Sequence, residues 1–144
     1  MKDLFLTVSM MLEQITHIKS VDDDSGQIDN YEERPAIALP CCLILIDQIF
    51  QPLGGGAYDV SSSIQVRVAF DRLGDRTVSG TPNLPRLKSL EKIDIVEQIT
   101  DALNGLFQEN VCSPLILQSL VSERRNDGLM VKVITLTETH EQYP

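Results

Sequence analysis

Apolar positions recur along this chain with two different periods, and each period predicts one kind of element. Steps of three and four residues predict an amphipathic helix over residues 3–16, with its apolar stripe at Leu4, Val8, Met11, Leu12 and Ile15. Between residues 58 and 70, apolar side chains take the even positions except Ser62, and mostly polar ones take the odd positions. This alternation predicts a long strand with one face toward the core.

A second helix is predicted by an apolar arc that ends in Phe107, and we expect it to stop after Asn110, near Pro114. Leu87 and Leu90 lie off this arc, so the first turns are expected to touch something else or to bend. The arc consists of Ile95, Val96, Ile99, Ala102, Leu103, Leu106 and Phe107.

Shorter apolar runs predict the remaining strands. Residues 18–31 suggest two short strands around an acidic turn at Gly26, and residues 35–39 and 41–46 form two runs interrupted by Pro40. The second of these runs lacks alternation, which favours a strand covered on both faces, central in a sheet. Residues 115–121 and 129–136 predict a hairpin that turns at residues 126–128.

Three segments show no periodic pattern. Residues 48–57 carry Pro52 and three consecutive glycines, which predicts a flexible connection. Residues 71–86 are rich in turn residues and are expected to be disordered or to form a working loop. Residues 139–144 are expected to be a flexible tail. The order of elements predicts one α+β domain over residues 1–144, a mostly antiparallel sheet with two helices packed against it.

The net charge and the cysteines limit the functions and the cellular compartments that we expect for this chain. The 144 residues contain 12 Lys and Arg against 21 Asp and Glu, and a net charge of −9 repels phosphate backbones, which argues against nucleic-acid binding. Residues 71–95 are locally basic, with five bases against four acids. Cys41 and Cys42 are adjacent and cannot easily bridge, so we expect a reduced, cytoplasmic compartment. No segment resembles a signal peptide or a membrane span, and we expect a soluble chain.

The candidate catalytic and metal-binding groups form no convincing set. The histidines are His17 and His140, and Cys41 and Cys42 lie in an apolar strand that makes thiolates scarce. We therefore expect no enzymatic activity and no cofactor. His17 beside the acids at 22–24 could chelate a divalent ion, but neighbouring carboxylates in a sequence are usually hydrated.

The acidic stretch at residues 22–33 also invites comparison with a calcium-binding loop. With Gly26 at position six, Asp23, Ser25 and Glu32 occupy positions three, five and twelve, but Val21 takes the place of the first carboxylate. Pro35 follows closely and leaves little room for the helix that should leave the loop. A solvated acidic hairpin fits these departures better, with a bound cation as the alternative.

The whole pattern resembles the small tail-completion or tail-terminator proteins of long-tailed bacteriophages and prophages. The resemblance covers residues 3–138 and is carried by spacing and hydrophobic pattern: the first helix, Arg34-Pro35-Ala36-Ile37, the long strand 58–71, a polar loop, the helix pattern 94–106 and the turn 124–129. It implies an α/β structural protein of the virion tail, assembled in the bacterial host cytoplasm, that forms a six-membered ring. Such a ring caps the tail tube and joins it to the head, with tail tube and head-completion proteins as partners.

Ring formation requires two complementary patches. Leu6 and Met10 lie one turn apart on the outer face of the first helix and could contact another chain, or could be ordinary surface residues. With Arg67 of the long strand and Arg72 and Arg76 of the basic loop, they form our candidate assembly interface. The alternative function is a small intracellular binding or chaperone-like module that recognises a protein partner through an exposed strand edge.

Overall fold

The computed structural model describes residues 1–71 and 84–144. Helix α1 spans Lys2–Glu13 and helix α2 spans Leu84–Leu103. The strands are β1 (Ser20–Asp23), β2 (Cys41–Gly54), β3 (Ala57–Asp71), β4 (Ile116–Ser122) and β5 (Leu129–Gln142). They form one five-stranded sheet in the order β1-β2-β3-β5-β4, in which only the short pair β1–β2 is parallel. The predicted α+β class is confirmed.

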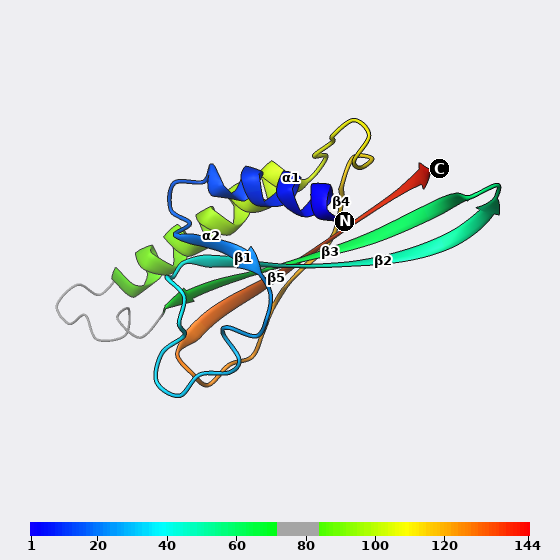
Figure 1. The fold of residues 1–144 in the computed structure, drawn as a ribbon. Coiled ribbons are helices and arrows are strands. Elements are labelled where there is room, and N and C mark those ends of the chain that lie inside the picture. Colours follow the sequence, from blue (N-terminus) through cyan, green and yellow to red (C-terminus); the bar gives the residue numbers. More distant parts are fainter. Residues whose placement is uncertain (72–83) are drawn as a thin grey trace.

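The sheet has a core on each face (Figure 1). Both helices cover the face to which the even residues of β3 point, and this larger core includes Leu12, Ile64, Phe70, Ile99 and Ile134. The opposite face carries a smaller core beneath residues 24–39, where Ile28 packs with Cys41, Leu43, Ala69, Leu129 and Val131. Because β2 and β3 are covered on both faces at this end, residues 41–44 are fully buried, and the expected interior position of this strand is confirmed.

Two predicted short strands do not exist. Residues 26–39 form turns and loop rather than strands, because Ile28, Tyr31, Ile37 and Leu39 turn their side chains onto the sheet instead of pairing along its edge. Helix α1 ends at Glu13 rather than at residue 16, and tighter three-residue hydrogen bonds such as Ile15 N–H to Leu12 O follow it.

Helix α2 also ends earlier than expected. Gly105 has φ of 82° and its N–H donates to Leu115 O, while Leu115 N–H donates to Leu106 O. A glycine in this left-handed conformation is a common helix stop. Leu106 and Phe107 therefore lie after the helix, although their spacing continues its apolar arc.

The strands of the sheet are longer than the sequence predicts. The expected flexible connection at 48–57 is wrong, because β2 runs to Gly54 and pairs with β3 from Cys41↔Ala69 to Gly54↔Ala57. Gly54, Gly55 and Gly56 have φ of 94°, 63° and 82° and form the turn. The expected tail at 139–144 is also wrong for residues 139–142, because β5 continues to Gln142 opposite Tyr58. The predicted strand 58–70 and the terminal hairpin are confirmed.

Candidate functional site

A three-stranded arm extends from the globular part of the molecule (Figure 1). It consists of residues 45–63 of β2 and β3, joined by the glycine turn, and residues 137–142 of β5, which pair with β3. Strand β1 pairs with β2 only at residues 41–44, so within the described chain the arm residues of β2 form a sheet edge with no partner strand. An open edge of this length can receive a strand or surface from another chain.

The two faces of the arm differ. On the face continuous with the helix side, the rings of Phe50 and Tyr58 meet edge to face, with centroids 6.0 Å apart. The outer face presents an apolar row along β2, Leu45, Ile49 and Leu53, with exposed fractions of 38%, 74% and 49%. Acids flank this row at Asp47, Asp59 and Glu141, and residues 45–63 and 137–142 contain no Lys or Arg.

A second exposed apolar row lies on the first half of α2. Leu87, Leu90 and Ile93 follow one another at steps of three residues, and 51%, 54% and 42% of their surfaces are exposed. Arg86 and Lys88 lie on the same two turns, whereas the ammonium of Lys92 is buried. Ile93 also lines a groove of about 500 Å³ between α2 and the β4–β5 hairpin, to which Arg124 and Lys132 contribute.

The predicted interface residues do not form one patch. Leu6 and Met10 are exposed on α1, at 44% and 61%. Arg67 is 8% exposed and lies on the opposite side of the sheet from the helices, where its partners belong to the same chain. Arg72 and Arg76, with most of the 71–86 loop, lie outside the described residues. An intermolecular role for these five residues stays a prediction.

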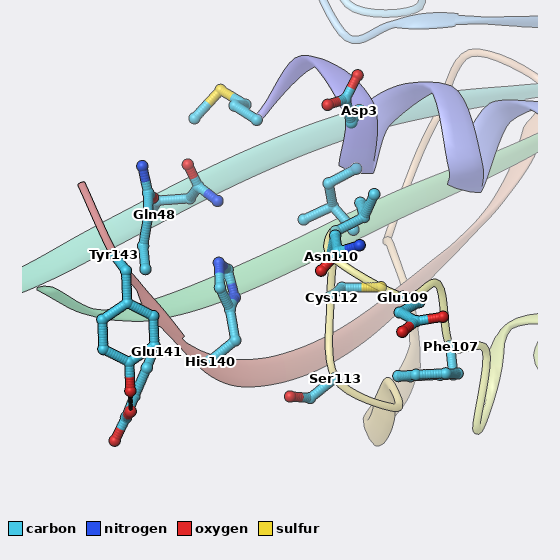
Figure 2. Close-up of a pocket in the computed structure, with 14 residues that line it drawn as sticks. Asp3, Gln48, Phe107, Glu109, Asn110, Cys112, Ser113, His140, Glu141 and Tyr143 are labelled. Atoms are coloured by element: carbon cyan, nitrogen blue, oxygen red, sulfur yellow. Dashed lines mark hydrogen bonds between the residues drawn. The ribbon is translucent and has the colours of Figure 1, made fainter. Parts of the chain in front are cut away.

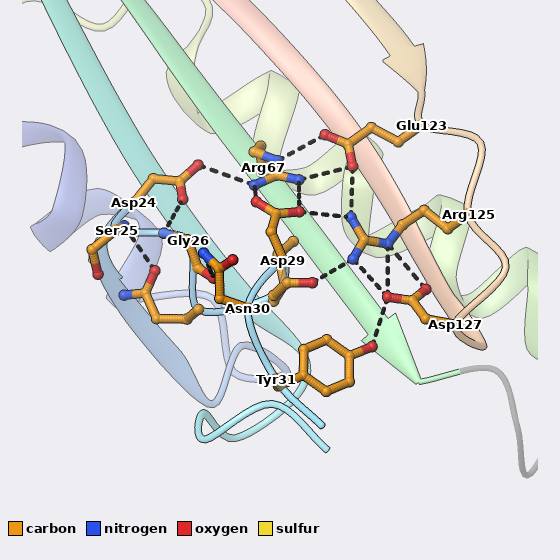
Figure 3. Close-up of polar contacts among 12 residues, drawn as sticks. Asp24, Ser25, Gly26, Asp29, Asn30, Tyr31, Arg67, Glu123, Arg125 and Asp127 are labelled. Carbon is orange, nitrogen blue, oxygen red and sulfur yellow. Dashed lines mark hydrogen bonds and ion pairs between the residues drawn. The ribbon is translucent and has the colours of Figure 1, made fainter. Parts of the chain in front are cut away.

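Arg67 is the centre of an ion-pair cluster that joins three separate parts of the chain (Figure 3). Its guanidinium donates to both oxygens of Glu123 at 2.8 Å and to both oxygens of Asp29 at 2.9 and 3.0 Å. A longer bond of 3.3 Å reaches Asp24. Arg125 contacts Asp29 and Glu123 as well, and donates to Asp127 and to the carbonyl of Ile28.

This arrangement shifts the pKa of four acidic side chains, namely those of Asp29, Tyr31, Glu123 and Asp127. Hydrogen bonds from Arg67 hold the pKa of Asp29 and of Glu123 below their ordinary values. The bond from Arg125 lowers the pKa of Asp127 strongly. Burial, aided by the Asp127 carboxylate that its hydroxyl faces at 2.6 Å, raises the pKa of Tyr31. The carboxylates stay ionised at neutral pH, and the cluster fastens residues 24–31 onto the sheet.

The acidic stretch thus has a role that the calcium-loop comparison missed. Asp24 and Asp29 pair with arginine side chains, and no group of three or more potential ligands in residues 1–71 and 84–144 is arranged to hold a metal ion. Sequence reasoning missed the cluster because members such as Asp29 and Arg125 are 96 residues apart. The one signal in the sequence is Arg67 itself, a long cation between the buried positions Val66 and Val68.

A second polar cluster fastens the base of the arm, beside a pocket of about 630 Å³ (Figure 2). The side chain of Glu138 is fully buried and accepts hydrogen bonds from Ser62 Oγ at 2.6 Å and from the backbone N–H of Ser113 at 3.2 Å. His140 Nδ1 lies 2.9 Å from both Glu138 oxygens, and Gln48 donates to Ser62. Because Ser62 donates to the carboxylate and not to the imidazole, this is not the arrangement in which a histidine activates a hydroxyl.

The cysteines are free and buried. Burial raises the pKa of Cys41 to about 11 and also raises the pKa of Cys42 and of Cys112. These thiols are protonated at neutral pH, and a protonated thiol is a much poorer nucleophile than a thiolate. Among the described residues, no helix is both long and apolar enough to cross a bilayer.

Comparison with known proteins finds a similar fold but no matching protein family. No family model matches the sequence, and no curated protein matches it. The fold is similar to that of a chain in the virion of a native gene transfer agent (GTA) particle, with a TM-score of 0.61 and 12% sequence identity. The match covers 96% of this chain and 95% of that one, so the similarity includes the arm as well as the core. At this identity the likeness shows the fold alone.

Proposed function

We propose that this protein is a structural component of a phage-like virion. The observation that carries the proposal is the fold match to a chain of the GTA virion, which spans both chains almost from end to end. The surfaces that the fold leaves exposed, the arm and the first half of α2, are apolar and suited to contact with other chains. The function we propose is therefore assembly with other virion proteins, without catalysis or a cofactor.

Within the virion, the role we propose is that of a tail terminator. Copies of the chain form a six-membered ring on the end of the tail tube, where head-completion proteins attach, and assembly takes place in the bacterial host cytoplasm. Two features support this role. The exposed apolar rows on the arm and on α2 are separate surfaces of one molecule, as a ring requires. The net charge of −9 suits a channel through which DNA passes without binding.

The experiment that tests this role is light scattering coupled to size exclusion, with negative-stain images of the heaviest species and with isolated tail tubes added. We expect a ring with a central hole that binds one end of the tube. A chain that remains monomeric at high concentration and does not bind tube ends contradicts the terminator role.

The second candidate is a binding or chaperone-like module, favoured by the open β2 edge of the arm. Such a module pairs its free edge with an extended peptide of a partner. It stays monomeric or dimeric when pure and binds a peptide in a one-to-one complex, so the same scattering measurement distinguishes it from a ring-forming protein.

A further inference from the structure

The two exposed apolar rows lie at opposite ends of the molecule and have opposite surroundings. The outer face of the arm combines Leu45, Ile49 and Leu53 with acids and has no base. The first half of α2 combines Leu87, Leu90 and Ile93 with Arg86 and Lys88, and the acids of this segment are Glu91 and Asp94. The ammonium of Lys92 is buried, and the further bases of this surface are Arg124 and Lys132 in the adjoining groove. Figure 1 places the glycine turn of the arm at one end of the molecule and the start of α2 at the other.

We propose that the outer face of the arm in one copy docks on the α2 row of a second copy. This inference rests on the proposed ring and names the surfaces that build it. In this contact Ile49 and Leu53 lie against Leu87, Leu90 and Ile93. Asp47 and Asp59 face the bases of α2, and Arg124 and Lys132 of the adjoining groove stand beside them.

The spacing of the rows permits this contact. Ile49 and Leu53 are four strand residues apart, roughly 13 Å. Leu87 and Ile93 are six helix residues apart, about 9 Å. The arm residues are further apart than the ends of the helix row, so Ile49 and Leu53 contact its two ends, with Leu90 between them.

Charge favours α2 over the exposed apolar pair on α1 as the docking surface. The α1 patch, Leu6 and Met10, belongs to a helix whose charged residues are Lys2, Asp3 and Glu13. An acidic arm gains nothing from these charges, whereas the bases on α2 attract it before contact. Because the docking surfaces differ and lie at opposite ends, each copy uses both, and the chain of contacts closes into a ring or continues as a filament.

The test uses two variants that damage one surface each. Ile49→Asp removes the arm row and Leu90→Asp removes the helix row, and both side chains are exposed in the monomer. Each variant alone is expected to raise the concentration needed for assembly about tenfold or more, because a charge is buried in the contact. Leu120→Asp on β4, also at an exposed apolar residue, is the matched control and is expected to assemble normally.

Mixing the two variants gives a sharper result. The Ile49→Asp copy keeps an intact α2 row and the Leu90→Asp copy keeps an intact arm, so the mixture is expected to form a one-to-one dimer and nothing larger. Circular dichroism of each variant establishes that it is folded. If both variants form rings as the Leu120→Asp control does, the proposed contact is wrong, and the ring itself stands.

A cross-linking experiment separates the contact from the ring. Ile49→Cys and Leu90→Cys proteins, one of them tagged, are mixed and oxidised mildly; the native cysteines are buried. A mixed disulfide dimer above the level of an Ile49→Cys and Leu120→Cys mixture supports the contact. If the unmodified chain forms no ring but this dimer appears, the contact stands and the terminator role fails. If neither appears, both are wrong.

Discussion

Arg67 is buried among residues of the same chain. Its ion pairs hold residues 24–31 on the sheet, although these residues form no helix or strand. The side chain is only 10% exposed and is surrounded by Asp24, Asp29 and Glu123. A buried guanidinium is tolerated only with such partners, since its desolvation otherwise costs several kcal/mol. The sequence pattern places the same residue on an assembly surface, because a polar residue at an odd position of an alternating strand predicts exposure.

Removing this guanidinium should destabilise the protein strongly. Arg67→Ala leaves Arg125 as the one cation of the cluster that contacts Asp29 and Glu123, and it leaves Asp24 without its ion pair. We expect the free energy of unfolding to fall by about 3 kcal/mol. Chemical denaturation measures the change. Arg34→Ala is the matched control, because Arg34 is 76% exposed in its pair with Asp71 and its loss should cost under about 1 kcal/mol. Equal effects of the two substitutions would show that the cluster contributes little.

The cluster should also make stability depend on pH. Asp29, Glu123 and Asp127 have folded pKa values below their ordinary 3.8 or 4.5, so folding favours their ionised forms. Their stabilisation is complete above about pH 5 and is lost as the pH falls through the lowered values. We expect the urea midpoint to fall between about pH 5 and about pH 3. In Arg125→Ala the carboxylates of the cluster have lost one cation, so the urea midpoint should fall less over this pH range. If the midpoint falls as much as in the unmodified protein, the pH dependence arises from groups outside the cluster.

At the scale of the elements, the sequence predicts best the helices and strands that bury one face in the core. The alternation over residues 58–70 and the helix stripes from Leu4 to Leu12 and from Ile95 to Leu103 consist largely of core residues, and the structure confirms these parts of the prediction. Phe107, the end of the predicted arc, lies after α2 and is exposed. The sequence pattern does not predict the ends of β2 and β5, because few side chains of the arm are buried. The conformation of these ends depends on pairing with β3 and not on a pattern of apolar residues. Pro52 and the glycines suggest a loose connection, but a proline is tolerated at an open sheet edge.

The turn of the arm depends on glycine at positions of positive φ. Gly55 has φ of 63°, and a side chain added there would meet open space, so a substitution is strained by the backbone alone. Asn tolerates this conformation and Val does not. We expect Gly55→Val to be about 1 kcal/mol less stable than Gly55→Asn by thermal or chemical denaturation. Equal stability of the two variants would mean that the turn can adopt another conformation.

At the scale of the whole molecule, the excess of acidic residues predicts weak or absent binding to DNA. Residues 45–63 contribute acids and no bases, while basic residues occur in the first half of α2 and around the β4–β5 turn. We expect no binding of duplex DNA by the protein in fluorescence anisotropy near about 0.1 M salt, where charges still act over about 10 Å. Binding that weakens steeply with added salt would instead indicate that the bases remain accessible in the assembly.

The proposed function could be predicted from the sequence only as a pattern, because assembly of the kind we propose depends on no reactive group. A catalytic site leaves a few residue types at fixed spacing, whereas an assembly surface leaves scattered apolar residues that also occur by chance. Leu87 and Leu90 do stand out, since they fall off the apolar arc of their helix, but nothing in the sequence shows that an acidic arm lies at the far end of the same molecule.

The continuous pairing of β3 with β5 has a mechanical consequence. The ladder runs unbroken from Tyr58 opposite Gln142 at the tip of the arm to Asp71 opposite Leu129 in the core. A pull on the tip along the strands loads all of these hydrogen bonds together in shear, instead of peeling them apart one by one. The arm can therefore transmit tension into the core, and a protein bound to its tip would be held by the whole molecule.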